Sequence, residues 1–178
     1  QIAAFETRDL VSLRTTSISA LSSAQIVAFT TAQASALTTR QTSSLSPEQI
    51  RALETSDLTV IATSNIQSFA TDAVFAMTTG QIFALNTAQV QSFNSMQISA
   101  LSTSQVAALE TPEDVAALST AAIAALQTNK IVALRTDQAA ALTPSQIVVL
   151  STQQLTAMES QDFAAISTAA VGNLMTAQ

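Results

Sequence analysis

The chain has 178 residues and a formal net charge of −6, from twelve acidic and six basic side chains. Only 10% of its residues are charged and 48% are hydrophobic, and histidine, cysteine and tryptophan are absent. Without histidine and cysteine the chain lacks the usual catalytic bases, thiol nucleophiles and transition-metal ligands, so we expect neither an enzyme nor a cofactor. No stretch approaches eighteen consecutive apolar residues, so we expect no membrane span.

An eight-residue unit, approximately Ile-x-Ala-Leu-x-Thr-x-Gln, repeats from residue 2 to residue 178. About twenty-two units, from 2–9 to 171–178, follow one another without a linker, and VAALETPED at 106–114 carries one additional residue. A fixed short period is typical of a repeat array. We therefore interpret 1–178 as one tandem-repeat array. Gln1 and Gln178 both occupy the last position of a unit, so we expect the array to be a fragment of a longer one.

Positions 1 and 4 of each unit carry apolar residues at helical spacing. Residues 46–49 (SPEQ) and 143–146 (TPSQ) begin with a Ser or Thr that can cap a helix, place Pro at the first helical position and Gln at the third. This order is a capping box with an N1 proline. Residues 111–114 (TPED) have the same order one residue later, which accounts for the insertion. In units without proline, either position 5 or position 6 could be the cap.

These signals predict an all-α solenoid with one helix of one to two turns per octad. A continuous helix is unsuitable, because eight residues at about 100° each overshoot two turns by about 80°, and the apolar stripe would circle the helix. In a strand, positions 1 and 4 would face opposite sides of the sheet. The many Thr and Val residues leave a β-solenoid as the alternative.

One unit cannot fold alone. Burial of its two large side chains gives roughly 3 to 6 kcal/mol, whereas ordering eight backbone residues costs roughly 8 to 16 kcal/mol. Stability must therefore be collective, as in other solenoids. We expect the position 4 residues Phe5, Phe29, Phe69, Met77 and Phe93 to be core rather than parts of a ligand pocket.

Acidic residues recur at positions 5 and 8 of units 1, 7, 14 and 20: Glu6 with Asp9, Glu54 with Asp57, Glu110 with Glu113 and Asp114, and Glu159 with Asp162. The first interpretation is capping, because carboxylates in a first helical turn are favoured by the helix dipole. If six to seven octads also made one superhelical turn, the pairs would lie along one edge. Glu110, Glu113 and Asp114 are then the calcium candidates, but calcium takes six to eight oxygens, so we predict no metal site.

LSPEQIRAL at 45–53 and LTPSQIVVL at 142–150 resemble the opening helix of the repeats in transcription-activator-like effectors. That resemblance implies a DNA-reading solenoid. The period of eight leaves no room for a second helix or a base-reading loop, and a phosphate-binding surface needs a basic stripe. The basic residues are few and scattered: Arg8, Arg14, Arg40, Arg51, Lys130 and Arg135. We therefore do not expect nucleic-acid binding.

Long runs of units such as LTTAQIAAL are similar to repeat regions of very large secreted or surface-attached bacterial proteins, often described as adhesin-like. The resemblance implies a non-enzymatic structural segment, a stalk or spacer outside the cell. An end of the array would leave an apolar stacking face exposed, including Val171 and Leu174 at the C-terminal end, so we expect end-to-end self-association.

A solenoid scaffold that binds peptide, glycan or nucleic acid through the variable positions 2, 5 and 7 is the alternative function. Ice binding through the recurrent Thr at position 6 is a more remote one. It requires these residues to lie exposed on a flat face, whereas Thr residues that cap helices would be turned inward.

Overall fold

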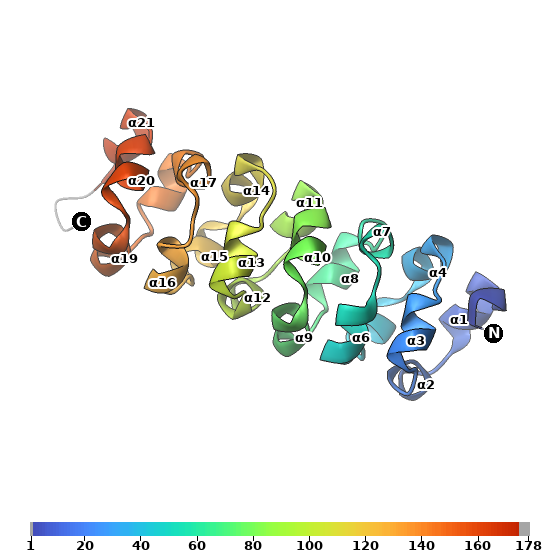
Figure 1. Ribbon diagram of the computed structural model, residues 1–178. Coiled ribbons are helices and arrows are strands. Elements are labelled where there is room, and N and C mark those ends of the chain that lie inside the picture. The colour runs from blue at the N-terminus through green and yellow to red at the C-terminus, as the bar shows by residue number, and fades with distance from the viewer. Residues whose placement is uncertain (1, 175–178) are drawn as a thin grey trace. The chain divides into compact units, whose positions relative to one another are not determined.

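The computed structural model describes residues 2–174 and contains, within them, twenty-one short α-helices, a 3-10 helix and no strand. The predicted all-α solenoid is therefore confirmed, and the β-solenoid alternative is wrong. The chain forms two compact units, Gln1–Ser92 and Phe93–Gln178. Figure 1 shows the short helices following one another along the chain. Gln1 and Gln178, which suggested a longer array, lie outside the described residues.

The first unit contains the 3-10 helix η1 at Ile2–Ala4 and eleven α-helices: α1 Thr7–Ser12, α2 Thr15–Ser19, α3 Ser23–Val27, α4 Thr31–Ala36, α5 Thr39–Thr42, α6 Pro47–Ala52, α7 Thr55–Leu58, α8 Thr63–Gln67, α9 Thr71–Ala76, α10 Thr79–Ala84 and α11 Thr87–Gln91. The second unit contains ten: α12 Ser95–Ala100, α13 Thr103–Ala107, α14 Pro112–Ala117, α15 Thr120–Ala124, α16 Thr128–Ile131, α17 Thr136–Ala140, α18 Pro144–Ile147, α19 Thr152–Ala157, α20 Ser160–Ala165 and α21 Thr168–Val171.

Each α-helix begins directly after position 5 of an octad, which settles the question of the cap. Ser46 and Thr143 cap α6 and α18 in complete capping boxes, as the prolines predicted. Thr111 does the same for α14 after the extra residue. Where position 5 is Thr, as at Thr30, it is again the cap, and the Thr that follows is the first helical residue. Position 6 is therefore N1 in the octads, and only in 106–114 does the extra residue make Thr111 the cap and Pro112 N1.

The helices end without a left-handed glycine, and even the C-cap Gly172 of α21 has a φ of −62°. No residue of 2–174 has a positive φ, so the left-handed glycine that closes many helices is not used here. After α4, for example, two consecutive residues adopt extended backbone, since Leu37 (φ −56°, ψ 135°) closes α4 and Thr38 (φ −82°, ψ 159°) caps α5. Other helices, such as α5 at Ser43, end with a C-cap in the right-handed helical region. A change of chain direction made with such backbone angles needs no glycine. A chain with only two glycines can therefore turn after every octad.

Within each unit, a helix packs against the helix three positions later. In the first unit α1 packs on α4, α4 on α7 and α7 on α10, and in the second α14 packs on α17 and α17 on α20. The remaining helices follow the same rule. Three octads therefore make one superhelical turn, half or less of the six to seven considered from the acidic pattern.

Positions 1 and 4 form the core. Phe29, Phe69, Met77 and Phe93 are all at most 6% exposed, as predicted. Phe5 is 44% exposed, so its assignment to the core is wrong. Phe5 lies in the first octad, which contacts other octads on one side only, and this half-contact leaves part of its ring uncovered. None of the helices in residues 2–174 is long and apolar enough to cross a membrane.

Candidate functional site

Position 8, the third residue of each α-helix, is the chemically distinctive position of the array. With the exception of the exposed Gln25, the glutamines described at this position are at most 5% exposed: Gln33, Gln41, Gln49, Gln81, Gln89, Gln97, Gln105, Gln138, Gln146 and Gln154. A buried amide must find hydrogen-bond partners for both its oxygen and its nitrogen, because each unpaired group costs stability.

Gln89 shows how both ends of the amide are used. Its Oε1 accepts a hydrogen bond from the backbone N–H of the cap Asn86 at 3.1 Å, and Asn86 Oδ1 accepts from the Gln89 N–H at 3.0 Å. Its Nε2 then donates to the carbonyls of Leu58 and Ile61, both at 2.8 Å, in the link between α7 and α8. One side chain thus caps its own helix and holds the preceding turn.

The same inter-turn bond recurs in both units. The amide donates to the position 4 carbonyl of an earlier octad at 2.7–3.0 Å, as seen for Gln33, Gln41, Gln49, Gln81, Gln89, Gln138, Gln146 and Gln154. In a helix of four to six residues most carbonyls lack an intrahelical partner. The buried amides supply partners for these carbonyls, so they stabilise the turn-to-turn stacking.

Two substitutions at position 8 keep a donor. Asn65 forms no capping box, because its cap Ala62 has no polar side chain, but its Nδ2 donates to the Leu37 carbonyl at 2.5 Å, and its Oδ1 accepts from the Thr39 hydroxyl at 2.9 Å. Lys130, 6% exposed, donates its Nζ to the Ser99 carbonyl. Burial lowers the pKa of Lys130.

Asp at position 8 cannot donate when ionised. Asp162 accepts a hydrogen bond from the Thr136 hydroxyl at 2.7 Å. Asp114 takes part in the capping box of α14, where its Oδ2 accepts from the Thr111 N–H at 3.1 Å, but its Oδ1 is buried without a hydrogen-bond partner. Asp57 also has one buried oxygen, Oδ2, without a partner.

Within each unit, the acidic pairs do not come together in one cluster. Glu6 and Asp9 belong to the α1 turn and Glu54 and Asp57 to the α7 turn, and α4 packs between those helices. In the second unit α17 packs between α14 and α20, which carry the other two groups. Stacking every third helix therefore places the groups of one unit in one column, two turns apart.

The calcium candidates Glu110, Glu113 and Asp114 lie around the start of α14, with the first two exposed and Asp114 buried. Within residues 2–174, no three acidic, histidine or cysteine side chains come together in a way that could hold a metal ion. The geometry therefore gives the calcium hypothesis no support.

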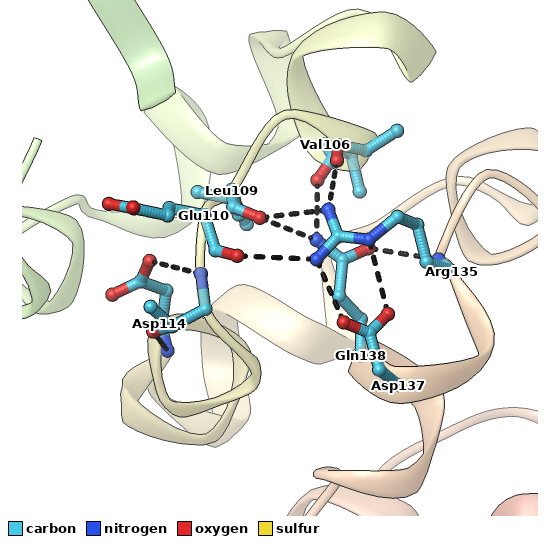
Figure 2. Close-up of polar contacts among 9 residues, drawn as sticks. Val106, Leu109, Glu110, Asp114, Arg135, Asp137 and Gln138 are labelled. Carbon is cyan, nitrogen blue, oxygen red and sulfur yellow. Dashed lines mark hydrogen bonds and ion pairs between the residues drawn. The ribbon is translucent and has the colours of Figure 1, made fainter. Parts of the chain in front are cut away.

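A cationic side chain already occupies the neighbourhood of these candidates. Figure 2 shows the Arg135 guanidinium between Asp137 and the backbone carbonyls of Leu109 and Glu110. It donates to Leu109 O at 3.0 Å, to Glu110 O at 3.3 Å and also to Ala107 O. The hydrogen bond from Arg135 lowers the pKa of Asp137. The extra residue of 106–114 lies in the segment after α13. Arg135 donates hydrogen bonds to the backbone carbonyls at the end of α13 and in this segment.

The Thr residues at position 6 do not cap helices, so the reason given against ice binding is wrong. Thr31, Thr55 and Thr79 are exposed first helical residues in one column of stacked helices. Some hydroxyls of this position bond the next turn, as Thr39 does to Asn65 and Thr136 to Asp162. They are therefore partly engaged in stacking.

Sequence reasoning missed the inter-turn role of position 8 and the role of Arg135. A capping box explains only the oxygen of the glutamine side chain. The signal for burial was Ala73, Ala122 and Ala170, which occupy position 8 in other units and are at most 1% exposed. A position that alternates between amide and alanine is more typical of an interior than of an exposed cap.

A repeat-family model, the ALTTAQ repeat, matches residues 2–39, 50–86, 82–111 and 112–144. No curated protein matches the chain. The family match identifies a tandem repeat and carries no activity, ligand or location. It covers most of the chain and follows the octads whose buried amides join the turns, so the chain belongs to the ALTTAQ repeat family.

Proposed function

We propose that the array is a non-enzymatic structural segment, a stalk or spacer, of a larger bacterial surface or secreted protein. The observation that carries this proposal is the amide-to-carbonyl bond that recurs from turn to turn, as in Gln49 with Leu21 and Gln146 with Leu118. Each added octad is held by the same contact as the one before. Length can then be changed by whole octads, which suits a spacer.

The buried polar side chains also favour a structural role over catalysis. The amides, Asn65 and Lys130 are bonded to the backbone of an earlier turn. A catalytic group needs access to a substrate, whereas these groups lie inside the stack. The adhesin-like resemblance of the repeats and the low charge of the chain support the surface or secreted location.

The test duplicates one superhelical turn, residues 26–49, within the full chain. If the segment is a spacer, the longer protein should unfold cooperatively, and its maximum dimension in small-angle scattering should grow by one helix-packing distance, roughly 8–10 Å. The matched control duplicates residues 26–53, which adds half an octad and places apolar and polar positions out of register. Equal behaviour of the two proteins, or a disordered insert in the first, would contradict the proposal.

We further propose that the segment associates with a second copy of itself, end to end. Near its C-terminal end, Leu155, Met158, Phe163 and Leu174 line an open apolar groove of about 390 Å³. Phe163 at position 1 is 38% exposed, unlike the buried position 1 residues of the octads before it. A second copy fits this face because stacking between copies would continue the contact that joins turns within one chain.

Gln25 is the matching donor near the other end. It forms the capping box with Ser22 but is exposed and makes no bond to an earlier turn. In the register of the other glutamines, its amide would reach the Val171 and Leu174 carbonyls of a second copy.

Sedimentation velocity over a hundredfold concentration range tests this association. Linear oligomers should form with rising concentration, and Leu174→Asp should suppress them by placing a charge on the apolar face. Asn173→Asp, an exposed neighbour, adds the same charge and should leave association unchanged. A strict monomer at all concentrations, or equal effects of the two variants, would refute the end-to-end contact.

The second candidate function is a binding scaffold, favoured by two exposed aromatic side chains at position 2. Phe75 is 61% exposed on α9 and Phe83 is 52% exposed on α10. Exposed aromatic residues are enriched at binding sites for peptides and other ligands. Screening against peptide and glycan arrays and against duplex DNA tests this function. The binding function is supported only by a ligand whose binding is lost in the double variant Phe75→Ser, Phe83→Ser. The net charge of −6 predicts that DNA will not be that ligand.

A further inference from the structure

Asp57 is a buried carboxyl that the stacking contacts leave incompletely bonded. It occupies position 8 of α7, which packs against α4, and its side chain is only 2% exposed. The Thr31 hydroxyl on α4 lies near the carboxyl and acts to lower its pKa. The other carboxyl oxygen, Oδ2, is buried and has no hydrogen-bond partner.

Asn65 occupies the same position one octad later, and its Nδ2 indicates which backbone carbonyl lies opposite Oδ2 of Asp57. Its oxygen accepts from Thr39, the counterpart of Thr31 beside Asp57, and its Nδ2 donates to the Leu37 carbonyl 28 residues earlier. The equivalent carbonyl for Asp57 is that of Phe29. An ionised carboxylate has no proton to donate to this carbonyl, whereas a protonated carboxyl has one.

We propose that Asp57 is a proton-dependent contact between two turns of the superhelix. When a proton from solvent binds to the carboxyl, its O–H donates to the Phe29 carbonyl and completes the contact between α4 and α7. When the proton leaves, two acceptors face each other and the contact is weakened. The stacking of these two turns therefore tightens in acid and loosens toward neutral pH.

The surroundings of Asp57 favour the protonated form. Neither α4 nor α10, the helices packed against α7, carries a charged or titratable side chain, and the charged neighbour is Glu54 on the turn of Asp57 itself. Burial raises the pKa of Asp57, the charge of Glu54 raises it further, and the Thr31 hydroxyl partly opposes this. Because the folded pKa exceeds the unfolded one, the stability contributed by protonation is complete below the unfolded pKa. It is lost as the pH rises through the folded pKa.

The test compares urea unfolding of the full chain with that of Asp57→Asn between about pH 4 and about pH 8, a range that brackets a raised aspartate pKa. The variant carries the Asn65 chemistry and mimics the protonated state at every pH. At neutral pH the unfolding constant of the wild type should exceed that of the variant by about tenfold for each unit of pKa elevation. This gap should close on acidification, and a gap that is absent or constant with pH would overturn the proposal.

Asn65→Asp is the reciprocal variant. It places a carboxyl opposite the Leu37 carbonyl, so the variant should lose stability at neutral pH and regain it in acid. A loss that does not recover in acid would overturn the proposal. Carbon-13 NMR of the Asp57 carboxyl adds a direct readout, since a titration midpoint at or below that of an ordinary aspartate would overturn it as well.

Discussion

Replacing Gln89 with alanine would measure what an inter-turn amide contributes. The Ile61 carbonyl would lose its partner inside the stack, at a cost of about 1–3 kcal/mol, while the Leu58 carbonyl keeps a backbone bond from Ile61, so its loss costs about 1 kcal/mol. Loss of the bond to the Asn86 N–H adds about 0.5–1 kcal/mol. We expect the free energy of unfolding to fall by about 2.5–5 kcal/mol in total.

Gln25→Ala is the matched control. Gln25 has the same capping box, with Ser22 N–H donating to its Oε1 at 2.8 Å, but no bond to an earlier turn. Its loss should cost only about 1 kcal/mol. Urea unfolding followed by far-UV circular dichroism gives both values, and hydrogen exchange of the α11 amides reports the local loss if the array does not unfold in one step. A Gln89→Ala protein no less stable than Gln25→Ala would refute the inter-turn role of the amides.

Three further substitutions address other contacts. Leu101→Ala removes a position 4 side chain that is 1% exposed and should cost about 2–5 kcal/mol in urea unfolding, whereas a change below about 0.5 kcal/mol would show that position 4 is not core. Lys130→Gln should stabilise the chain at neutral pH. Because burial lowers the pKa of Lys130, its charge costs stability below the folded pKa, and this cost disappears as the pH rises to the unfolded pKa. A gain that grew with pH would contradict this reasoning. Arg135→Ala should cost about 1–3 kcal/mol through the Ala107 and Glu110 carbonyls, since the Leu109 carbonyl keeps its bond from Gln138. Arg14→Ala, at the same octad position but exposed, should cost less than about 0.5 kcal/mol, and equal losses would contradict the role of Arg135.

The local structure could be predicted because it depends on neighbouring residues. A proline after Ser46 or Thr143 has one suitable place at a helix start, and this fixed the phase of the octads. The apolar residues at positions 1 and 4 then had to face inward, as Leu101 and Phe69 do.

The number of octads per turn could not be predicted, because it depends on contacts between residues about 30 positions apart. The period of the acidic residues suggested six to seven octads, but Asp9 and Asp57 lie two turns apart, because α4 packs between α1 and α7. The amide nitrogen of an inter-turn glutamine, such as Gln89 or Gln146, bonds to a backbone carbonyl. Every residue has such a carbonyl, so the pattern of side chains does not indicate which one is the partner. Phe5 was misassigned because periodicity does not distinguish the first octad from later ones.

Stacking every third helix gives the array a large reserve of length. A turn of three octads advances the superhelix by one helix-packing distance, roughly 8–10 Å. The same three octads, pulled straight, span roughly 80 Å. A tether built this way would yield by releasing successive turns under tension, and each release would lengthen the chain about eightfold over that turn and dissipate the energy of its amide bonds. Single-molecule stretching would register these releases as regular steps, and the proposed spacer would then also dissipate mechanical energy.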